Sequence, residues 1–309
     1  MTAPHPTLRI ATRGSALALW QARHVASLIA AAHPALHVEL VEVTTTGDRV
    51  LSQPLRDFGG QGAFTREVQA AVLDGRADVA VHSLKDLPTE PTPGLCLAAV
   101  PARGVTDDAL VMPTGSSIGD FAALPHGARI GTGSPRRQAQ LRHLRPDLQV
   151  FEVRGNVETR LRKVDTGEFD ALVLAAAGLI RLGLEQRITQ RLTPPQMYPA
   201  VGQGAIGIEC RDGDEATARV LSDICEAATW HAVIAERSLL AALRAGCHAP
   251  VGATTRIDGD RLALEAVVLS GDGQQRWTAQ AVGAVTNART IGEDVAKSLM
   301  AQGASRVLR

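Results

Sequence analysis

The chain has 309 residues, 45% of them hydrophobic, and its 32 basic residues balance its 32 acidic residues at neutral pH. This composition supplies the cores of about two or three globular domains. A formal net charge of zero excludes a whole-molecule field for nucleic acid or an anionic membrane, so any anion recognition must be local. The N-terminus shows no export signal and no apolar run approaches the roughly twenty residues of a membrane span, so we expect a cytoplasmic protein.

The cysteines and histidines carry no recognisable metal or disulfide pattern. No CxxC spacing and no HExxH motif occurs, so we predict no metal and expect most cysteines to be small buried hydrophobes. The cysteines are Cys96, Cys210, Cys225 and Cys247.

The N-terminal part alternates between strand and helix patterns. Residues 8–12 read as a strand, and Ser15 is placed to cap a helix over 16–32. A strand over 36–43 and a helix over 64–73 follow, with the glycine-rich loop Gly59–Gly62 between them. That loop is a candidate lid.

The most informative stretch is the apolar run Val79–His82, which ends in Ser83, Lys85 and Asp86. Ligands of open α/β sheets bind outside the carboxyl ends of strands, so Asp86 lies where chemistry is expected if the sheet is parallel. The chain has only three lysines, and one of them is placed beside this carboxylate. The alternative is a polar turn after a strand.

The segment from about 106 to 193 repeats this layout. Residues 129–134 echo 9–15, and the sequence before the strand 171–175 echoes the sequence before Val79. We therefore expect two similar α/β units with a ligand cleft between them.

A second candidate site lies in this repeat, where Thr132, Gly133 and Ser134 join a strand to a helix that begins with Pro135. Backbone N–H groups and the positive end of a helix dipole favour an anion there, and arginine forks bind carboxylates bidentately. The arginines expected to bind are Arg136, Arg137, Arg154 and Arg160. For Arg142, Arg145 and Arg162 we favour a solvated helix face with salt bridges.

The C-terminal part follows a different pattern. A glycine-studded strand over 200–209 is expected to cross back to the first unit. A helix over 229–243, two strands joined at Asp272-Gly273 and a helix over 290–300 then predict a small α+β domain. The expected domains are 1–101 with 200–218, 106–195, and 222–309.

Cys247 lies on a Gly-Cys-His loop rather than in an apolar run. A thiol on a loop near His248 and Arg244 forms thiolate more readily than a buried one. It could serve as a covalent tether, and the alternative is an inert loop cysteine.

Taken together, six stretches resemble the porphobilinogen deaminase (hydroxymethylbilane synthase) family. They are Leu8–Arg13, Val81–Pro88, Gly131–Arg137, Arg154–Val157, Pro199–Gly204 and Gly246–Cys247. The resemblance implies two similar periplasmic-binding-protein-like α/β domains around a cleft, plus a small α+β C-terminal domain. It also implies a monomeric transferase that joins four porphobilinogen molecules head to tail with release of ammonia. The linear tetrapyrrole is then released by hydrolysis.

The resemblance also assigns roles to residues. Asp86 would be the catalytic carboxylate, and Cys247 would hold a dipyrromethane cofactor through a thioether. Cofactor binding would fall to Ser83, Lys85, Thr132, Ser134, Arg136 and Arg137. Substrate binding would fall to Arg13, Ser15, Arg154, Arg160 and Arg181. These residue types suit the chemistry, because loss of ammonia leaves a cation that a carboxylate stabilises, and each pyrrole carries two carboxylates for arginines to bind.

The sequence departs from the family pattern at Asp57 and Gln61 in the lid, where basic residues are common, and at Gly14 and His248. The residues leave two other functional classes open. A non-catalytic, carboxylate-binding protein of the solute-binding type would share the fold. A nucleic-acid binder is disfavoured by the zero net charge and 3% aromatic content.

Overall fold

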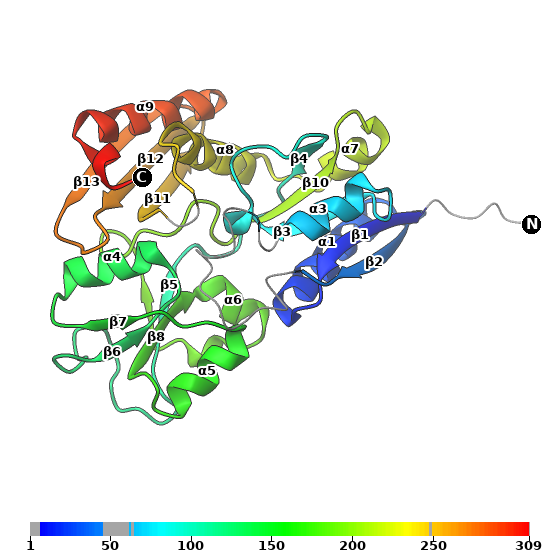
Figure 1. The fold of residues 1–309 in the computed structure, drawn as a ribbon. Coiled ribbons are helices and arrows are strands. Elements are labelled where there is room, and N and C mark those ends of the chain that lie inside the picture. The colour runs from blue at the N-terminus through cyan, green and yellow to red at the C-terminus, as the bar shows by residue number, and fades with distance from the viewer. Residues whose placement is uncertain (1–6, 46–61, 63–64, 247–248, 309) are drawn as a thin grey trace, which may run out of the picture. The chain divides into compact units, whose positions relative to one another are not determined.

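The computed structural model describes residues 7–45, 62, 65–246 and 249–308 (Figure 1). They form two compact units. One unit comprises Met1–Arg103 and Ala205–Trp230, and the other comprises Gly104–Gly204 and His231–Arg309. The chain therefore passes between units at 103/104, 204/205 and 230/231.

The first unit is built on a five-stranded sheet with the order β2-β1-β3-β10-β4. Its first three strands are parallel, whereas β10 runs antiparallel to both of its neighbours. The strands are β1 (Thr7–Arg13), β2 (His37–Val43), β3 (Val79–Ser83), β4 (Leu95–Ala99) and β10 (Ile206–Arg211). The helices are α1 (Ala16–Ala32), α3 (Arg66–Leu73) and α7 (Glu215–Ser222).

The second unit contains another five-stranded sheet, with the order β7-β6-β8-β5-β9. Three strands are again parallel, and β5 is antiparallel to both of its neighbours. The strands are β5 (Asp108–Val111), β6 (Arg129–Gly131), β7 (Gln149–Phe151), β8 (Ala171–Ala175) and β9 (Gln190–Leu192). The helices are α4 (Pro135–Leu144), α5 (Val157–Asp165) and α6 (Ala176–Arg181).

The repeat predicted from the sequence is confirmed by these two strand orders and by a shared ion pair. Arg9 binds Asp78 through Nη2 at 2.9 Å, and Arg129 binds Asp170 through Nη2 at 2.7 Å. In both sheets the same arginine also donates its backbone N–H to that aspartate. The mixed α/β class and its duplication follow from these features.

The remaining elements include a three-stranded antiparallel sheet in the order β11-β12-β13. Helix α9 packs on this sheet, which confirms the predicted α+β part (Figure 1). The elements are α8 (Ala227–Ala242), β11 (Val251–Asp258), β12 (Arg261–Leu269), β13 (Arg276–Ala284) and α9 (Ala288–Ala301). Short 3-10 turns are η2 (Leu84–Asp86), η3 (Glu185–Arg187), η4 (Val285–Asn287) and η5 (Ala304–Val307).

Two expectations about strands are wrong. The predicted strand over 200–209 begins only at Ile206, because Gly202 and Gly204 adopt φ of 72° and 81° and make turns. Strand β11 was missed, because Gly252 interrupts its apolar pattern. The Cβ of any other residue at Gly252 would lie 2.6 Å from the Tyr198 Cβ, so the glycine permits close packing there.

Apolar side chains cover both faces of each five-stranded sheet. In the first unit, one face packs Ile10, Val25 and Ile208 with α1, and the other packs Val68 and Val72 of α3. Within the described residues, no helix has the length and apolar character needed to cross a bilayer. The same residues contain no group of three or more His, Cys, Asp or Glu side chains that could hold a metal ion.

Candidate active site

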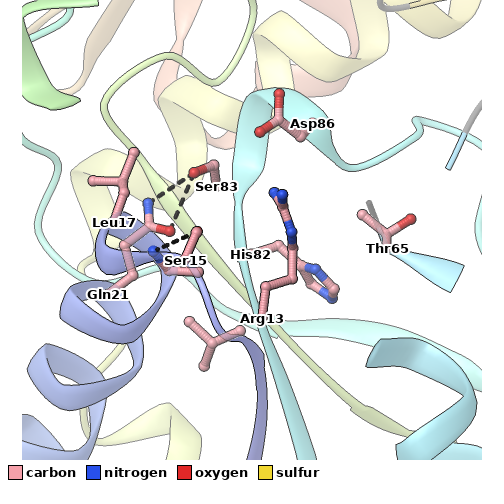
Figure 2. A pocket seen from close by; sticks show the side chains of 10 residues that line it. Arg13, Ser15, Leu17, Gln21, Thr65, His82, Ser83 and Asp86 are labelled. Carbon is pink, nitrogen blue, oxygen red and sulfur yellow. Dashed lines mark hydrogen bonds between the residues drawn. The ribbon is translucent and has the colours of Figure 1, made fainter. Parts of the chain in front are cut away.

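A pocket in the first unit lies at the carboxyl ends of β1 and β3 (Figure 2). It brings together four residues predicted to act in the site, namely Arg13, Ser15, Ser83 and Asp86. In Figure 2 the Arg13 side chain extends in the direction of Asp86. The rest of the lining consists of Leu17, Ala18, Gln21, Thr65, Val81 and His82.

Asp86 reaches this pocket because β3 ends in a tightly held turn. Strand β3 is paired on one side with β1 and on the other with β10, so its apolar residues are buried on both faces. Leu84 then anchors the turn η2, with 1% of its surface exposed and its N–H donated to the Ala205 carbonyl at 3.0 Å. Leu87 is also buried, which leaves Lys85 and Asp86 half-buried between two fixed apolar residues.

The two serines of the pocket are held in different ways. The Ser15 hydroxyl accepts the Ala18 N–H at 3.4 Å and caps helix α1, as predicted. The Ser83 hydroxyl lies 2.8 Å from the amide nitrogen and 3.1 Å from the amide oxygen of Gln21. Gln21 was missed from the sequence. Its signal is a polar side chain on the buried face of α1, one position before Ala22 and four before Val25.

A buried polar trio beside the pocket was also missed. The Gln69 amide nitrogen lies 3.1 and 2.9 Å from the two carboxylate oxygens of Glu209. The His82 Nε2 lies 3.0 Å from the same carboxylate but outside hydrogen-bond geometry, so the contact is one of proximity. Because these residues lie far apart in sequence, only the β3–β10 pairing brings His82 and Glu209 together.

The second predicted site follows β6, where the chain enters α4. Thr132 is fully buried, and its carbonyl accepts the Gln138 side-chain N–H at 3.0 Å. Ser134 occupies the N-cap position of α4, but its side chain makes no cap hydrogen bond. Pro135 is the first helical residue, as predicted.

The guanidinium groups of Arg136 and Arg137 are buried rather than spread over an open anion site. Arg136 Nη1 lies 2.7 Å from Asp108 Oδ2 and also donates to the Tyr198 carbonyl. Arg137 Nη2 lies 2.7 Å from Asp108 Oδ1. Their roles in cofactor binding remain predictions, and Asp108 was not foreseen.

Three further predicted arginines lie in the second unit. The Arg154 Nε donates to Glu152 at 2.9 Å, and the Arg160 Nε donates to the Gly155 carbonyl at 2.8 Å. The Arg181 Nη2 donates to the Gly204 carbonyl at 2.7 Å. Burial lowers the pKa of Arg181 to about 10. Their roles in substrate binding stay predictions.

Several predicted features fall outside the described residues. These are Cys247, His248, Asp57 and positions 59–61 of the glycine-rich loop. The cofactor attachment and the lid therefore stay predictions, as does the cleft between the two units.

Comparison with known proteins covers nearly the whole chain. Residues 8–219 match the family model described as "Porphobilinogen deaminase, dipyromethane cofactor binding domain", and residues 230–301 match "Porphobilinogen deaminase, C-terminal domain". A porphobilinogen deaminase of Stenotrophomonas maltophilia is 48% identical over 302 residues, which cover 98% of this chain and 99% of that protein. A porphobilinogen deaminase of Syntrophotalea carbinolica is 46% identical over 301 residues, which cover 97% of this chain and 95% of that protein.

Among solved structures, the periplasmic VFT2 domain of Bordetella pertussis BvgS aligns with a TM-score of 0.43 and 18% identity. The alignment covers 71% of this chain and 87% of that domain. A likeness at this level carries no argument about function.

Proposed function

The chain belongs to the porphobilinogen deaminase family, and from that premise we propose how its own residues divide the work of a hydroxymethylbilane synthase. The enzyme joins four porphobilinogen molecules head to tail on a dipyrromethane primer, releases ammonia at each addition, and frees the linear tetrapyrrole by hydrolysis. This places it in porphyrin and haem biosynthesis.

The observation that carries the assignment of residues is the pocket at the end of β3. It holds Asp86 together with Arg13 and Ser83, so a carboxylate, a guanidinium and a hydroxyl meet at the carboxyl ends of β1 and β3. Such a group of polar side chains at the carboxyl edge of parallel strands is the usual setting for ligand binding in an α/β sheet.

Asp86 would act on the cation that forms during each addition. The aminomethyl group reacts as its ammonium form, so its carbon–nitrogen bond breaks and the electron pair leaves with neutral ammonia. The pyrrole that remains is a methylenepyrrolenine cation, which a carboxylate held beside it stabilises. The electron pair of the attacking pyrrole carbon then forms the new carbon–carbon bond, and that carbon releases its proton to water, which restores the aromatic ring.

Arginines would bind the substrate through its acetate and propionate groups. Arg13 lies in the Asp86 pocket, where a guanidinium fork suits a carboxylate, and Ser15 lies beside it. Arg154, Arg160 and Arg181 would supply further charge from the second unit. Each of them donates to a partner that helps to fix the side chain, as described above.

The primer would be held by a thioether to Cys247 and by polar contacts from both sheets. One feature of the described residues fits a ligand that carries carboxylates: Arg136 Nε and Nη2 are buried and have no hydrogen-bond partner. The contacts would come from Ser83, Lys85, Thr132, Ser134, Arg136 and Arg137. When bound, the dipyrromethane supplies the pyrrole carbon to which the first substrate is joined.

A solute-binding protein without catalysis is not favoured, because both family models and the curated relatives belong to an enzyme. A monomeric state and a cytoplasmic location remain predictions.

The proposal is tested by incubating the purified full-length protein with porphobilinogen and measuring ammonia and the linear tetrapyrrole. We expect both products to accumulate, with one ammonia released for each porphobilinogen consumed. Saturable binding of porphobilinogen without ammonia release would contradict the proposal and would favour a binding protein.

A further inference from the structure

A buried cluster of charges stands where β5, helix α4 and the segment after Tyr198 meet. Asp108 has none of its surface exposed, and its two oxygens face two different arginines. Oδ2 lies 2.7 Å from Arg136 Nη1, whereas Oδ1 accepts the Arg137 Nε–H at 2.9 Å. One carboxylate therefore holds both guanidinium groups.

The charges of this cluster do not balance. Burial by itself would raise the pKa of Asp108, but Arg136 and Arg137 outweigh that effect and hold it at about 2. The carboxylate is therefore ionised near neutral pH, and two guanidinium groups share one negative charge. A net positive charge remains in a site where Arg136 is 3% exposed and Arg137 is 5% exposed. Burying such a charge without a counter-ion is costly.

The donors that remain unused belong to Arg136. Its Nη1 is taken by Asp108 and the Tyr198 carbonyl, while Nε and Nη2 have no hydrogen-bond partner among the described residues. These two nitrogens form one edge of the guanidinium fork, the edge that takes a carboxylate bidentately. Arg137, by contrast, also donates to the Val173 carbonyl at 3.2 Å and to Gln203 at 3.4 Å.

The Gln203 side chain links Asp108 to the backbone at Thr106. Its amide nitrogen lies 2.8 Å from Asp108 Oδ1 and 2.6 Å from the Thr106 carbonyl. Gln203 has none of its surface exposed, so these contacts are made in the interior of the unit. Asp108 is thereby held by Gln203 as well as by the two arginines.

We propose that Asp108 is a positioning residue for the primer. It holds Arg136 and Arg137 side by side and reduces their joint charge to one, so that the pair accepts a single carboxylate of the dipyrromethane on the free edge of Arg136. This inference rests on the proposed function, and it adds a role for a residue that does not itself touch the primer.

The experiment compares Asp108→Asn and Asp108→Glu with the parent chain and with a control, Asp147→Asn. Asp147 also binds an arginine through both oxygens, at 2.7 Å from Arg145 Nε and Nη2, at the opposite end of α4. Primer loading is followed by intact mass while the primer-free fraction of each full-length protein is incubated with porphobilinogen. Thermal unfolding is recorded in parallel.

We expect the parent and Asp147→Asn to load alike. Asp108→Glu keeps the charge but moves it by one methylene, so it should load at least about tenfold more slowly. Asp108→Asn leaves two uncompensated guanidinium groups, so inorganic phosphate should inhibit its loading at about tenfold lower concentration than in the parent. A purely structural role would lower the unfolding temperature without changing the sensitivity to phosphate.

Loading of Asp108→Glu at the parental rate would overturn the proposal, and so would an Asp108→Asn protein with parental sensitivity to phosphate. If Asp108→Asn does not fold, the Glu variant decides alone. A parent that never gains a two-pyrrole adduct would instead overturn the proposed function, and this inference with it.

Discussion

The two five-stranded sheets share one strand order but present opposite chemistry at equivalent positions. In the first sheet Ser83 at the end of β3 pairs with Ile206 of β10. In the second sheet the equivalent residue of β8 is Ala175, which pairs with Asp108 of β5. At this pair of positions, the polar side chain lies on the parallel strand β3 in the first sheet and on the antiparallel strand β5 in the second.

This exchange changes what each strand end can do. In the first sheet the apolar Ile206 needs no charged partner, and Asp86 stays half-buried in a pocket. In the second sheet Asp108 is fully buried and draws Arg136 and Arg137 inward. On our account the first strand end stabilises a cation, and the second holds an anion. The two strand ends therefore share one strand order and differ in a few side chains.

The largest expected effect comes from removing the Asp86 carboxylate of the first unit. We expect Asp86→Ala to lower turnover of porphobilinogen by about 10²–10³-fold or more, because the developing cation loses its carboxylate. The fold should be retained, since Asp86 is half-buried and lies between the fixed residues Leu84 and Leu87. Steady-state kinetics and thermal unfolding check both statements. The control is Glu90→Ala, which removes an exposed carboxylate from the same loop and should change neither. Near-normal turnover of Asp86→Ala would remove Asp86 from its role.

The buried carboxylate of the second sheet should show in the pH dependence of stability. The pKa of Asp108 is lowered to about 2 in the folded protein, from 3.8 for an ordinary aspartate. The unfolded chain therefore binds the proton more tightly, and stability on the order of 2 kcal/mol is present above about pH 4 and lost as the pH falls through about 2. Urea unfolding from pH 5 to pH 2 should show a steeper loss for the parent than for Asp108→Asn. Equal slopes would mean that Asp108 is not ionised in the folded state.

A third test changes the residues that follow the equivalent threonines Thr12 and Thr132. These are Arg13, the last residue of β1, and Gly133, which lies after β6. A Cβ at Gly133 would lie 2.8 Å from the Val153 carbonyl oxygen, so Gly133→Ala should cost about 1–3 kcal/mol of unfolding free energy. Arg13→Gly should instead raise KM for porphobilinogen. Denaturant unfolding and steady-state kinetics separate the two effects. A destabilised Arg13→Gly with unchanged KM would reverse our assignment of the two positions.

The smallest expected difference concerns the two N-cap serines. Ser15 accepts the Ala18 N–H, so Ser15→Ala should cost about 1 kcal/mol of unfolding free energy. Ser134 makes no such bond, so Ser134→Ala should leave stability nearly unchanged. Parallel urea titrations of the two variants measure this difference. Equal losses would show that Ser134 caps its helix in solution.

Features that depend on local pattern could be predicted from the sequence. Helix α1 was predicted over 16–32, the residues it occupies, because Ser15 and the apolar spacing mark its start and its inner face. The position of Asp86 after a buried strand was likewise predicted from a local sequence pattern. The duplication was visible because residues 129–134 echo 9–15 and the sequence before the strand 171–175 echoes the sequence before Val79.

Contacts made through the antiparallel strands β5 and β10 could not be predicted from local sequence patterns. Asp108 lies 28 residues from Arg136, and only the pairing of β5 with β8 brings its carboxylate under helix α4. Likewise, Glu209 reaches His82 because β10 returns from a distant part of the chain. The arginines of α4 were therefore placed correctly on their helix, but their burial was not foreseen.

The central claim is that this chain carries a covalent dipyrromethane primer on Cys247 and extends it with porphobilinogen. The most direct measurement is the intact mass of the purified protein beside its Cys247→Ala variant, before and after porphobilinogen is added. We predict an adduct the size of two linked pyrrole units on the parent, further mass in pyrrole steps after substrate is added, and neither on the variant. A parent that keeps its bare polypeptide mass after incubation with porphobilinogen, or a variant that gains the same adduct, would contradict the account.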